Sequence, residues 1–271
     1  MKTKIAFICN WGVSSSQLLE LYKKQTPDDA GVWENLIGVS NPNEADVIVA
    51  LGQVQPGIYD PSKIIQFRRE PDFIESWKPI EGAKEVFDYS DNKYHVSTWW
   101  IDLKWNTLRD LKYHKTKNAN IVASSKWQHR REYIQKITNL LPNTFDVYGN
   151  VLGNVDLSKN IMGAFHRSVK FSTLMDYKYS VAIENSSQSN YFSEKIIDCM
   201  LLWTIPLYWG CPNISEYFPE NSYRLLDIND PNQIKEVLER PITEKDIDAL
   251  REARDLIMYK YNIWPTIQKT I

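Results

Sequence analysis

The sequence predicts an α/β protein made of two domains, and three observations support that prediction. The chain has 271 residues, which is more than one domain of ordinary size usually holds. Short apolar runs alternate with helical patterns, as is typical of parallel sheets covered by helices. A complete strand–helix–strand unit lies between Tyr179 and Trp209, and such a unit joins parallel strands by a right-handed crossover.

The first domain should begin with a buried strand over Lys4–Cys9, because every residue after Lys4 in that run is apolar. A loop follows, and then a helix that places Leu18 and Tyr22 on one face. Two further strands are expected at Ala45–Leu51 and Lys63–Phe67. The loop after the first strand lacks the glycine pattern of a dinucleotide site, so no such site is predicted there.

A carboxylate stands at the end of the third of these strands. Glu70 precedes Pro71, which favours an extended backbone at Glu70. Ligands of parallel sheets bind at the carboxyl ends of the strands, so Glu70 should point toward a binding site. The alternative is a surface acid paired with Arg68 or Arg69.

The next segments contain two more strand candidates and then a change of composition. Phe87–Ser90 and Tyr94–Trp100 are the strand candidates, and they carry Asp88 and His95. A lone histidine is more often structural than functional. Trp105–Lys117 is basic and polar, which favours an interdomain linker. We therefore expect one domain over residues 1–117 and a second over 118–271.

The second domain should open with a strand at Asn120–Ser125 and a helix at Trp127–Leu141, which ends before Pro142. A further strand is expected at Phe145–Gly149. After Pro219 one strand and several helices follow, and the last helices are expected to return to the first domain.

The strand–helix–strand unit contains the most specific chemistry of the chain. A strand over Tyr179–Ile183 ends in a polar loop, and Ser193 is a good N-cap for the apolar helix that follows. Thr204–Trp209 is the second strand. Lys195 stands in the first helical turn, where a cation costs about 0.3–1 kcal/mol unless it serves an anion such as a diphosphate. The alternative is a solvated lysine beside Glu194 as a capping acid.

The segment IENS…YFSEKIIDCMLLWTIPLYWGCPNI resembles the signature of the α1,3-fucosyltransferase family, which is also described as glycosyltransferase family 10. Ile183 replaces the usual phenylalanine and Ser193 the usual threonine, and both departures are mild. The resemblance extends from about Lys63 to Pro219 and is strong from Asn118 onward. It implies the glycosyltransferase-B fold, in which two Rossmann-like α/β domains face each other across a cleft.

The resemblance also implies a reaction: inverting transfer of a sugar, with L-fucose from GDP-fucose as the leading donor, to a hydroxyl of a glycan acceptor, without an obligatory metal or other cofactor. Glu70 looks like the catalytic base, and Asp88 and His95 are acceptor-side candidates. Arg130 matches the arginine that reaches the diphosphate, with Arg131 as its neighbouring alternative. The donor-binding residues implied are Arg130, Asn185, Tyr191, Glu194 and Lys195. Removing Lys195 should weaken nucleotide binding and hardly change stability.

Two alternatives remain open at the level of sequence. An enzyme with the same fold and the same signature can use another donor, for example a UDP-sugar such as UDP-xylose, because a fold does not determine a function. A non-catalytic nucleotide- or glycan-binding protein would leave Glu70 idle. Asp246 and Asp248 form the DxD pattern of metal-dependent glycosyltransferases, but they stand at a helix start, where acids are ordinary capping partners.

Composition excludes several other classes. The net charge of -2 argues against a nucleic-acid-binding protein. No apolar run approaches the roughly 20 residues that a membrane-spanning helix needs. Three cysteines without metal-ligand spacing fit a reducing compartment. We therefore expect a soluble cytoplasmic protein. Within the family that the chain resembles, this implies similarity to the soluble bacterial or viral members.

Overall fold

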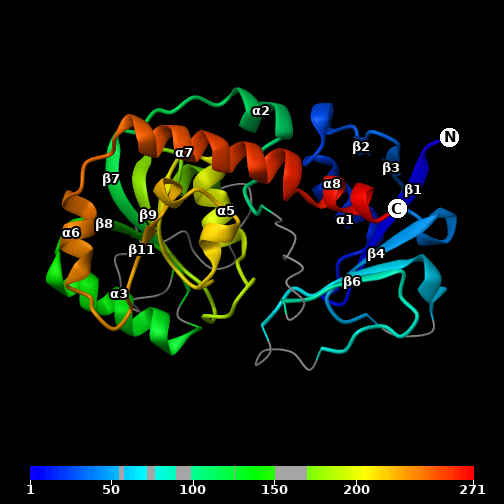
Figure 1. Ribbon diagram of the computed structural model, residues 1–271, viewed down its shortest axis with the longest axis horizontal. Coiled ribbons are helices and arrows are strands. Elements are labelled where there is room, and N and C mark those ends of the chain that lie inside the picture. The colour runs from blue at the N-terminus through cyan, green and yellow to red at the C-terminus, as the bar shows by residue number, and fades with distance from the viewer. Residues whose placement is uncertain (55–57, 72–76, 90–98, 125, 150–169) are drawn as a thin grey trace.

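The computed structural model describes residues 1–54, 58–71, 77–89, 99–124, 126–149 and 170–271. It contains two separate β-sheets, each with helices packed against it (Figure 1). The predicted α/β class with two parallel-sheet units is confirmed.

The first sheet has the strand order β2-β3-β1-β4-β5-β6, and only the β2–β3 pair is antiparallel. Its strands are β1 (Thr3–Cys9), β2 (Val32–Trp33), β3 (Leu36–Gly38), β4 (Val47–Leu51), β5 (Ile64–Phe67) and β6 (Glu85–Phe87). Helix α1 (Ser15–Lys23) packs on this sheet through Leu18 and Tyr22, as its periodicity predicts. Every residue of β4 is buried, as expected of a strand covered on both faces.

The second sheet is entirely parallel, with the order β11-β10-β9-β7-β8. Its strands are β7 (Lys117–Val122), β8 (Phe145–Tyr148), β9 (Tyr177–Ile183), β10 (Ile205–Trp209) and β11 (Arg224–Leu225). The helices of this part are α2 (Trp105–Asp110), α3 (Gln128–Leu140), α5 (Glu194–Leu201), α6 (Gln233–Glu239) and α7 (Glu244–Asp255). Strand β7 lies between β8 and β9, so the order of strands reverses at the β7–β9 pair. Such a reversal is where α/β sheets bind ligands.

The C-terminal segment connects the two sheets. Helix α7 crosses the second sheet and continues through a π-helical turn, η8 (Leu256–Lys260), into α8 (Ile263–Thr270), which lies beside α1 (Figure 1). Trp264 of α8 is fully buried in the core of the first sheet, and its indole N–H donates a 2.9 Å hydrogen bond to the carbonyl of Tyr22. The last helix therefore packs with the first strands of the chain. A domain boundary at residue 117 stays a prediction.

Two sequence predictions are modified by the structure. The segment expected as a linker contains helix α2, because Trp105 and Leu108 share one face and are buried. The strand expected at Phe87–Ser90 is observed earlier, as β6.

Asp246 caps helix α7 as expected: its carboxylate accepts hydrogen bonds from the backbone N–H and the hydroxyl of Thr243, at 2.7 and 2.6 Å. Among the helices in the described ranges, none has the length and apolar character needed to cross a bilayer.

Candidate functional site

The site lies at the carboxyl edge of the second sheet, where the strand order reverses. Helices α3 and α5 both begin at this edge, after β7 and β9 respectively. Between them is a cavity of about 30 Å³, lined by side chains of both helices and both strands. Free N–H groups at two helix starts and a cavity between them suit an anionic ligand.

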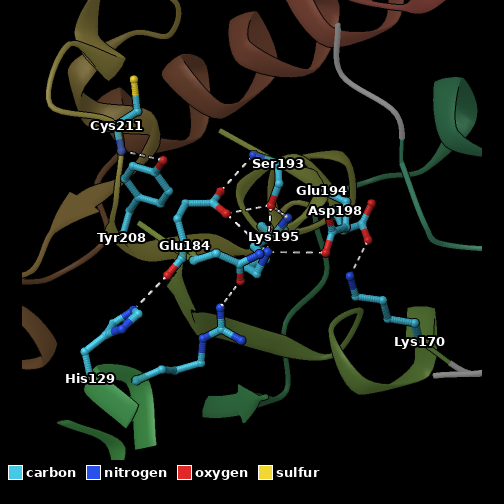
Figure 2. A network of polar contacts seen from close by, with 12 residues as sticks. His129, Lys170, Glu184, Ser193, Glu194, Lys195, Asp198, Tyr208 and Cys211 are labelled. Atoms are coloured by element: carbon cyan, nitrogen blue, oxygen red, sulfur yellow. Dashed lines mark hydrogen bonds and ion pairs between the residues drawn. The ribbon is translucent and has the colours of Figure 1, made fainter. Parts of the chain in front are cut away.

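Glu184 directly follows β9 and is the centre of the polar network at this edge (Figure 2). Its side chain is fully buried. The carboxylate accepts hydrogen bonds from the backbone N–H of Ser193 at 2.8 Å, from the Ser193 hydroxyl at 2.6 Å and from the Lys195 ammonium at 3.2 Å. A Cβ at Gly210 would collide with this side chain, so glycine is required there. The buried charge is thus fully partnered, as a buried carboxylate must be.

Lys195 stands in the first turn of α5, and the Ser193 hydroxyl accepts from its backbone N–H, as expected of an N-cap. Its ammonium also donates to the Ser193 hydroxyl at 2.9 Å and lies 3.6 Å from the Glu194 carboxylate. The side chain keeps 20% of its surface exposed. Lys195 is therefore held by Glu184 but remains open to the site. The sequence did not predict this buried partner.

Arg130 lies in the first turn of α3 and is 5% exposed, whereas Arg131 is exposed. Its Nη2 donates a 2.6 Å hydrogen bond to Oδ1 of Asn185, and its Nε is buried with no partner in the described part of the chain. Next to it, a ring nitrogen of His129 donates to the carbonyl of Glu184 at 3.1 Å (Figure 2). Of the two adjacent arginines, Arg130 is the one turned into the site.

Glu194 and Tyr191 differ in how they can contact a ligand. Burial opposes ionisation of Glu194, but the ammonium groups of Lys195 and Lys170 outweigh it and hold the pKa at about 2. Glu194 is therefore a charged acceptor for hydroxyl groups. Tyr191 is 1% exposed, and burial raises the pKa of its phenol, which stays neutral. Its ring meets the ring of Tyr89 edge-on, with centroids 5.3 Å apart.

Glu70 follows β5 of the first sheet, and its side chain is partly buried. Burial raises the pKa of its carboxyl, and Lys195 is the strongest of the cations that oppose this rise. The charge of Lys195, which belongs to α5 beside the second sheet, therefore favours the ionised form of Glu70. The Arg68 guanidinium pairs with Asp88 at 2.9 Å, and its Nε donates to the backbone carbonyl of Glu70 at 3.2 Å.

Of the two acceptor-side candidates, Asp88 and His95, the structure describes only Asp88. Asp88 is 15% exposed, is paired with Arg68 and also accepts from the backbone N–H of Tyr89. His95 lies outside the described residues. Among the described residues, no three His, Cys, Asp or Glu side chains gather as metal ligands would.

Sequence reasoning missed three residues of this site. Glu184 was included in a turn-forming cluster, although an acid that directly follows the apolar run Val181–Ile183 is a signal of a partnered carboxylate. Lys170 and Asp198 form an ion pair of 2.6 Å beside the network (Figure 2). They are 28 residues apart, so no local pattern predicts their contact.

Comparison with known proteins identifies a consistent set of relatives. The family "Glycosyltransferase family 10 (fucosyltransferase) C-term" matches residues 112–248, about half of the chain. Alpha-(1,3)-fucosyltransferase B of Drosophila melanogaster is 27% identical over 124 residues, which are 44% of this chain and 28% of that protein. GDP-fucose protein O-fucosyltransferase 3 of Xenopus laevis is 28% identical over 99 residues, 36% of this chain and 21% of that protein. The matched segments thus span about a quarter of these curated relatives.

Two solved structures are similar over almost the whole chain. An alpha1,3-fucosyltransferase with GDP-fucose has a TM-score of 0.54 at 20% identity, and the match covers 96% of this chain and 82% of that one. A second alpha1,3-fucosyltransferase structure has a TM-score of 0.55 at 18% identity, with the same coverage. At this identity the likeness shows the fold, and the glycosyltransferase-B arrangement expected from the sequence is confirmed.

Proposed function

The chain belongs to glycosyltransferase family 10, the fucosyltransferases, and on that premise we propose that it transfers L-fucose from GDP-fucose to a hydroxyl group of an acceptor glycan. The observation that carries the proposal is the cavity at the starts of α3 and α5, which is lined by Arg130 and Lys195. Glu70, at the end of a strand in the first sheet, is a carboxylate whose ionisation the charge of Lys195 favours. A base and a cation site on opposite sheets suit a reaction that joins two substrates. In this proposal residues 1–117 bind the acceptor and residues 118–271 the donor.

The donor diphosphate would lie at the starts of α3 and α5. Arg130 offers its buried Nε, and Asn185 fixes the orientation of its guanidinium. Lys195 offers its ammonium from a position anchored by Glu184. These two cations and the free N–H groups of α5 would stabilise the charge that grows on the departing diphosphate, the task that a metal ion performs in other transferases.

The two remaining donor-side residues suit the sugars. Glu194 is ionised and can accept hydrogen bonds from hydroxyls of the ribose or the fucose. Tyr191 carries a neutral phenol and can donate one. These roles agree with the resemblance of the segment to the family signature, and each can be tested by removal of the polar group.

Glu70 would act as the base. Its carboxylate takes the proton of the acceptor hydroxyl while the hydroxyl oxygen attacks the anomeric carbon and the bond from that carbon to the diphosphate oxygen breaks. Attack opposite the leaving group inverts the configuration. Burial raises the pKa of Glu70, which makes the carboxylate a stronger base than an exposed glutamate.

The decisive experiment is a donor and acceptor screen with the purified full chain. GDP-fucose should give transfer to a glycan hydroxyl, and slow hydrolysis without acceptor, while UDP-sugars such as UDP-xylose should give neither. Serine- and threonine-containing peptides belong in the acceptor panel, because the relatives include protein O-fucosyltransferases. Turnover of a UDP-sugar alone would assign another donor, and GDP binding without transfer or hydrolysis would favour a binding protein.

The proposed independence from metal has its own test. The GDP affinity of the chain should be unchanged after treatment with a strong chelator, because Arg130 and Lys195 supply the positive charge. Loss of binding on chelation, with recovery on addition of Mn²⁺ or Mg²⁺, would refute this part of the proposal and return attention to Asp246 and Asp248.

A further inference from the structure

The charged side chains around the cavity all have the same sign. Among the described residues that line it, the ionised ones are Arg130, Lys170 and Lys195, and no carboxylate is part of the wall. The cavity of about 30 Å³ has room for one or two oxygen atoms and not for a nucleotide. Three cations around so small a space favour the oxygens of an anionic group.

Two of these cations are paired with carboxylates that do not line the cavity. Glu184 binds the ammonium of Lys195, as described above. Asp198 of α5 is fully buried, and its Oδ2 binds the ammonium of Lys170 at 2.6 Å. The other oxygen of Asp198 accepts the backbone N–H of Trp100 at 2.9 Å. Figure 2 shows Glu184 on one side of Lys195, and Asp198 with Lys170 on the other side. Both lysines thus have one buried acid outside the cavity wall.

A purely structural role explains this arrangement less well. A buried ion pair seldom adds net stability, because the desolvation of both charges offsets their attraction. The backbone N–H of Trp100 needs only an acceptor, which an uncharged side chain also offers. A lysine ammonium has three donors, and Asp198 is the one hydrogen-bond acceptor found for Lys170 in the described structure. The remaining N–H groups are available to a ligand in the cavity.

We propose that Lys170 is a third cation for the diphosphate of the donor, and that Asp198 holds it toward the cavity shared with Arg130 and Lys195. This inference rests on the proposed function, because it assumes that the cavity receives diphosphate oxygens. Lys170 lines the same cavity as Arg130 and Lys195, and this places it beside the donor-side residues.

The test must separate loss of the cation from loss of the fold. Lys170→Met alone leaves the Asp198 charge buried without its partner and is expected to destabilise the protein. The informative variant is therefore Lys170→Met/Asp198→Asn, in which the new amide oxygen still accepts the Trp100 N–H. Lys178→Ala, which removes an exposed lysine of β9, is the matched control.

The double variant should bind GDP about tenfold or more weakly than wild type in a calorimetric titration, since it loses a charge-assisted contact to phosphate. GMP should lose less affinity, guanosine almost none, and the control variant should match wild type. Asp198→Asn alone keeps the Lys170 charge but weakens the contact that holds it, so GDP binding should weaken by less than in the double variant. GDP affinity of the double variant within twofold of wild type would overturn the inference.

Two further outcomes would also support or reject the role proposed for Lys170. If the double variant does not fold, Asp198→Asn decides alone: weaker binding of GDP with unchanged binding of guanosine would support the inference, and GDP binding equal to wild type would overturn it. If wild type binds no GDP, the proposed donor is wrong, and titration with inorganic pyrophosphate takes its place. Pyrophosphate binding that is lost in the double variant would then keep Lys170 as an anion-binding residue, and equal binding would reject it.

Discussion

The side-chain amide of Asn190 donates a hydrogen bond of 2.8 Å to the backbone carbonyl of Tyr89. Asn190 belongs to the loop before α5, and Tyr89 follows the last strand of the first sheet. The Oδ1 atom of Asn190 accepts from the amide of Asn213 at 2.8 Å and from the hydroxyl of Tyr217 at 2.7 Å. Asn190 is 3% exposed and has a φ of 64°, a conformation that asparagine tolerates better than most residues. One side chain thus joins the donor-side loop to the part of the chain that carries Glu70.

Asn190→Asp should reduce transfer and spare donor binding. Aspartate keeps oxygen acceptors for Asn213 and Tyr217 but turns an oxygen toward the carbonyl of Tyr89, which repels it. Small displacements between reacting groups cost up to roughly 10²-fold in rate, so we expect kcat to fall by about 10- to 100-fold. The GDP Kd should stay within about threefold of wild type. Asn190→Gly, which keeps the backbone conformation, is the control for loss of the whole side chain. A loss of GDP affinity as large as the loss of kcat would contradict a positioning role.

Glu70→Gln should keep GDP binding and lose transfer. The amide has the shape of the carboxylate but cannot take the proton of the acceptor, and loss of a general base costs on the order of 10²–10⁴ in rate. Rates at saturating donor and acceptor, together with a GDP titration, test this directly. Turnover within a fewfold of wild type would remove Glu70 from the mechanism. The search for a base would then move to His95, since Asp88 is paired with Arg68.

The pH dependence of the transfer rate should also identify Glu70 as the base. Glu70 is active when deprotonated, and burial raises the pKa of its carboxyl in the folded protein. The transfer rate should therefore fall as the pH falls through a value above the ordinary glutamate pKa of about 4.3. In Glu70→Gln the residual rate should lack this acid limb. An identical limb in both proteins would assign it to another group.

Lys195→Ala should weaken GDP binding by about tenfold or more, through loss of a charge-assisted contact to phosphate. The structure adds a second effect, because Glu184 would be left buried without its counter-charge. The melting temperature should therefore fall, contrary to the expectation from sequence alone. Lys195→Met/Glu184→Gln, which removes both charges, should recover much of the stability and none of the affinity. Stability equal to wild type in Lys195→Ala would refute the structural dependence of Glu184 on this lysine.

The sequence by itself determined the features that depend on neighbouring residues. The unit formed by β9, α5 and β10 is found where its periodicity places it, with Ser193 as the N-cap, because hydrophobic spacing and capping act within one or two turns. Asp246 was assigned to a helix start for the same reason. The resemblance of this unit to the fucosyltransferase signature led to the family, which the comparison confirms.

Only the tertiary structure decided which partners these residues have. The Trp100 backbone reaches Asp198 across 98 residues of sequence, and Asn190 reaches Tyr89 across 101. No local pattern encodes such contacts, because they depend on how the two sheets are brought together. The same holds for the buried Glu184 behind Lys195: its position after a strand was visible in the sequence, but its burial was not. A carboxylate that is buried in the folded protein needs a cation beside it, and Lys195 is that cation for Glu184. Lys195 is therefore a structural partner of Glu184 as well as a candidate for binding the diphosphate.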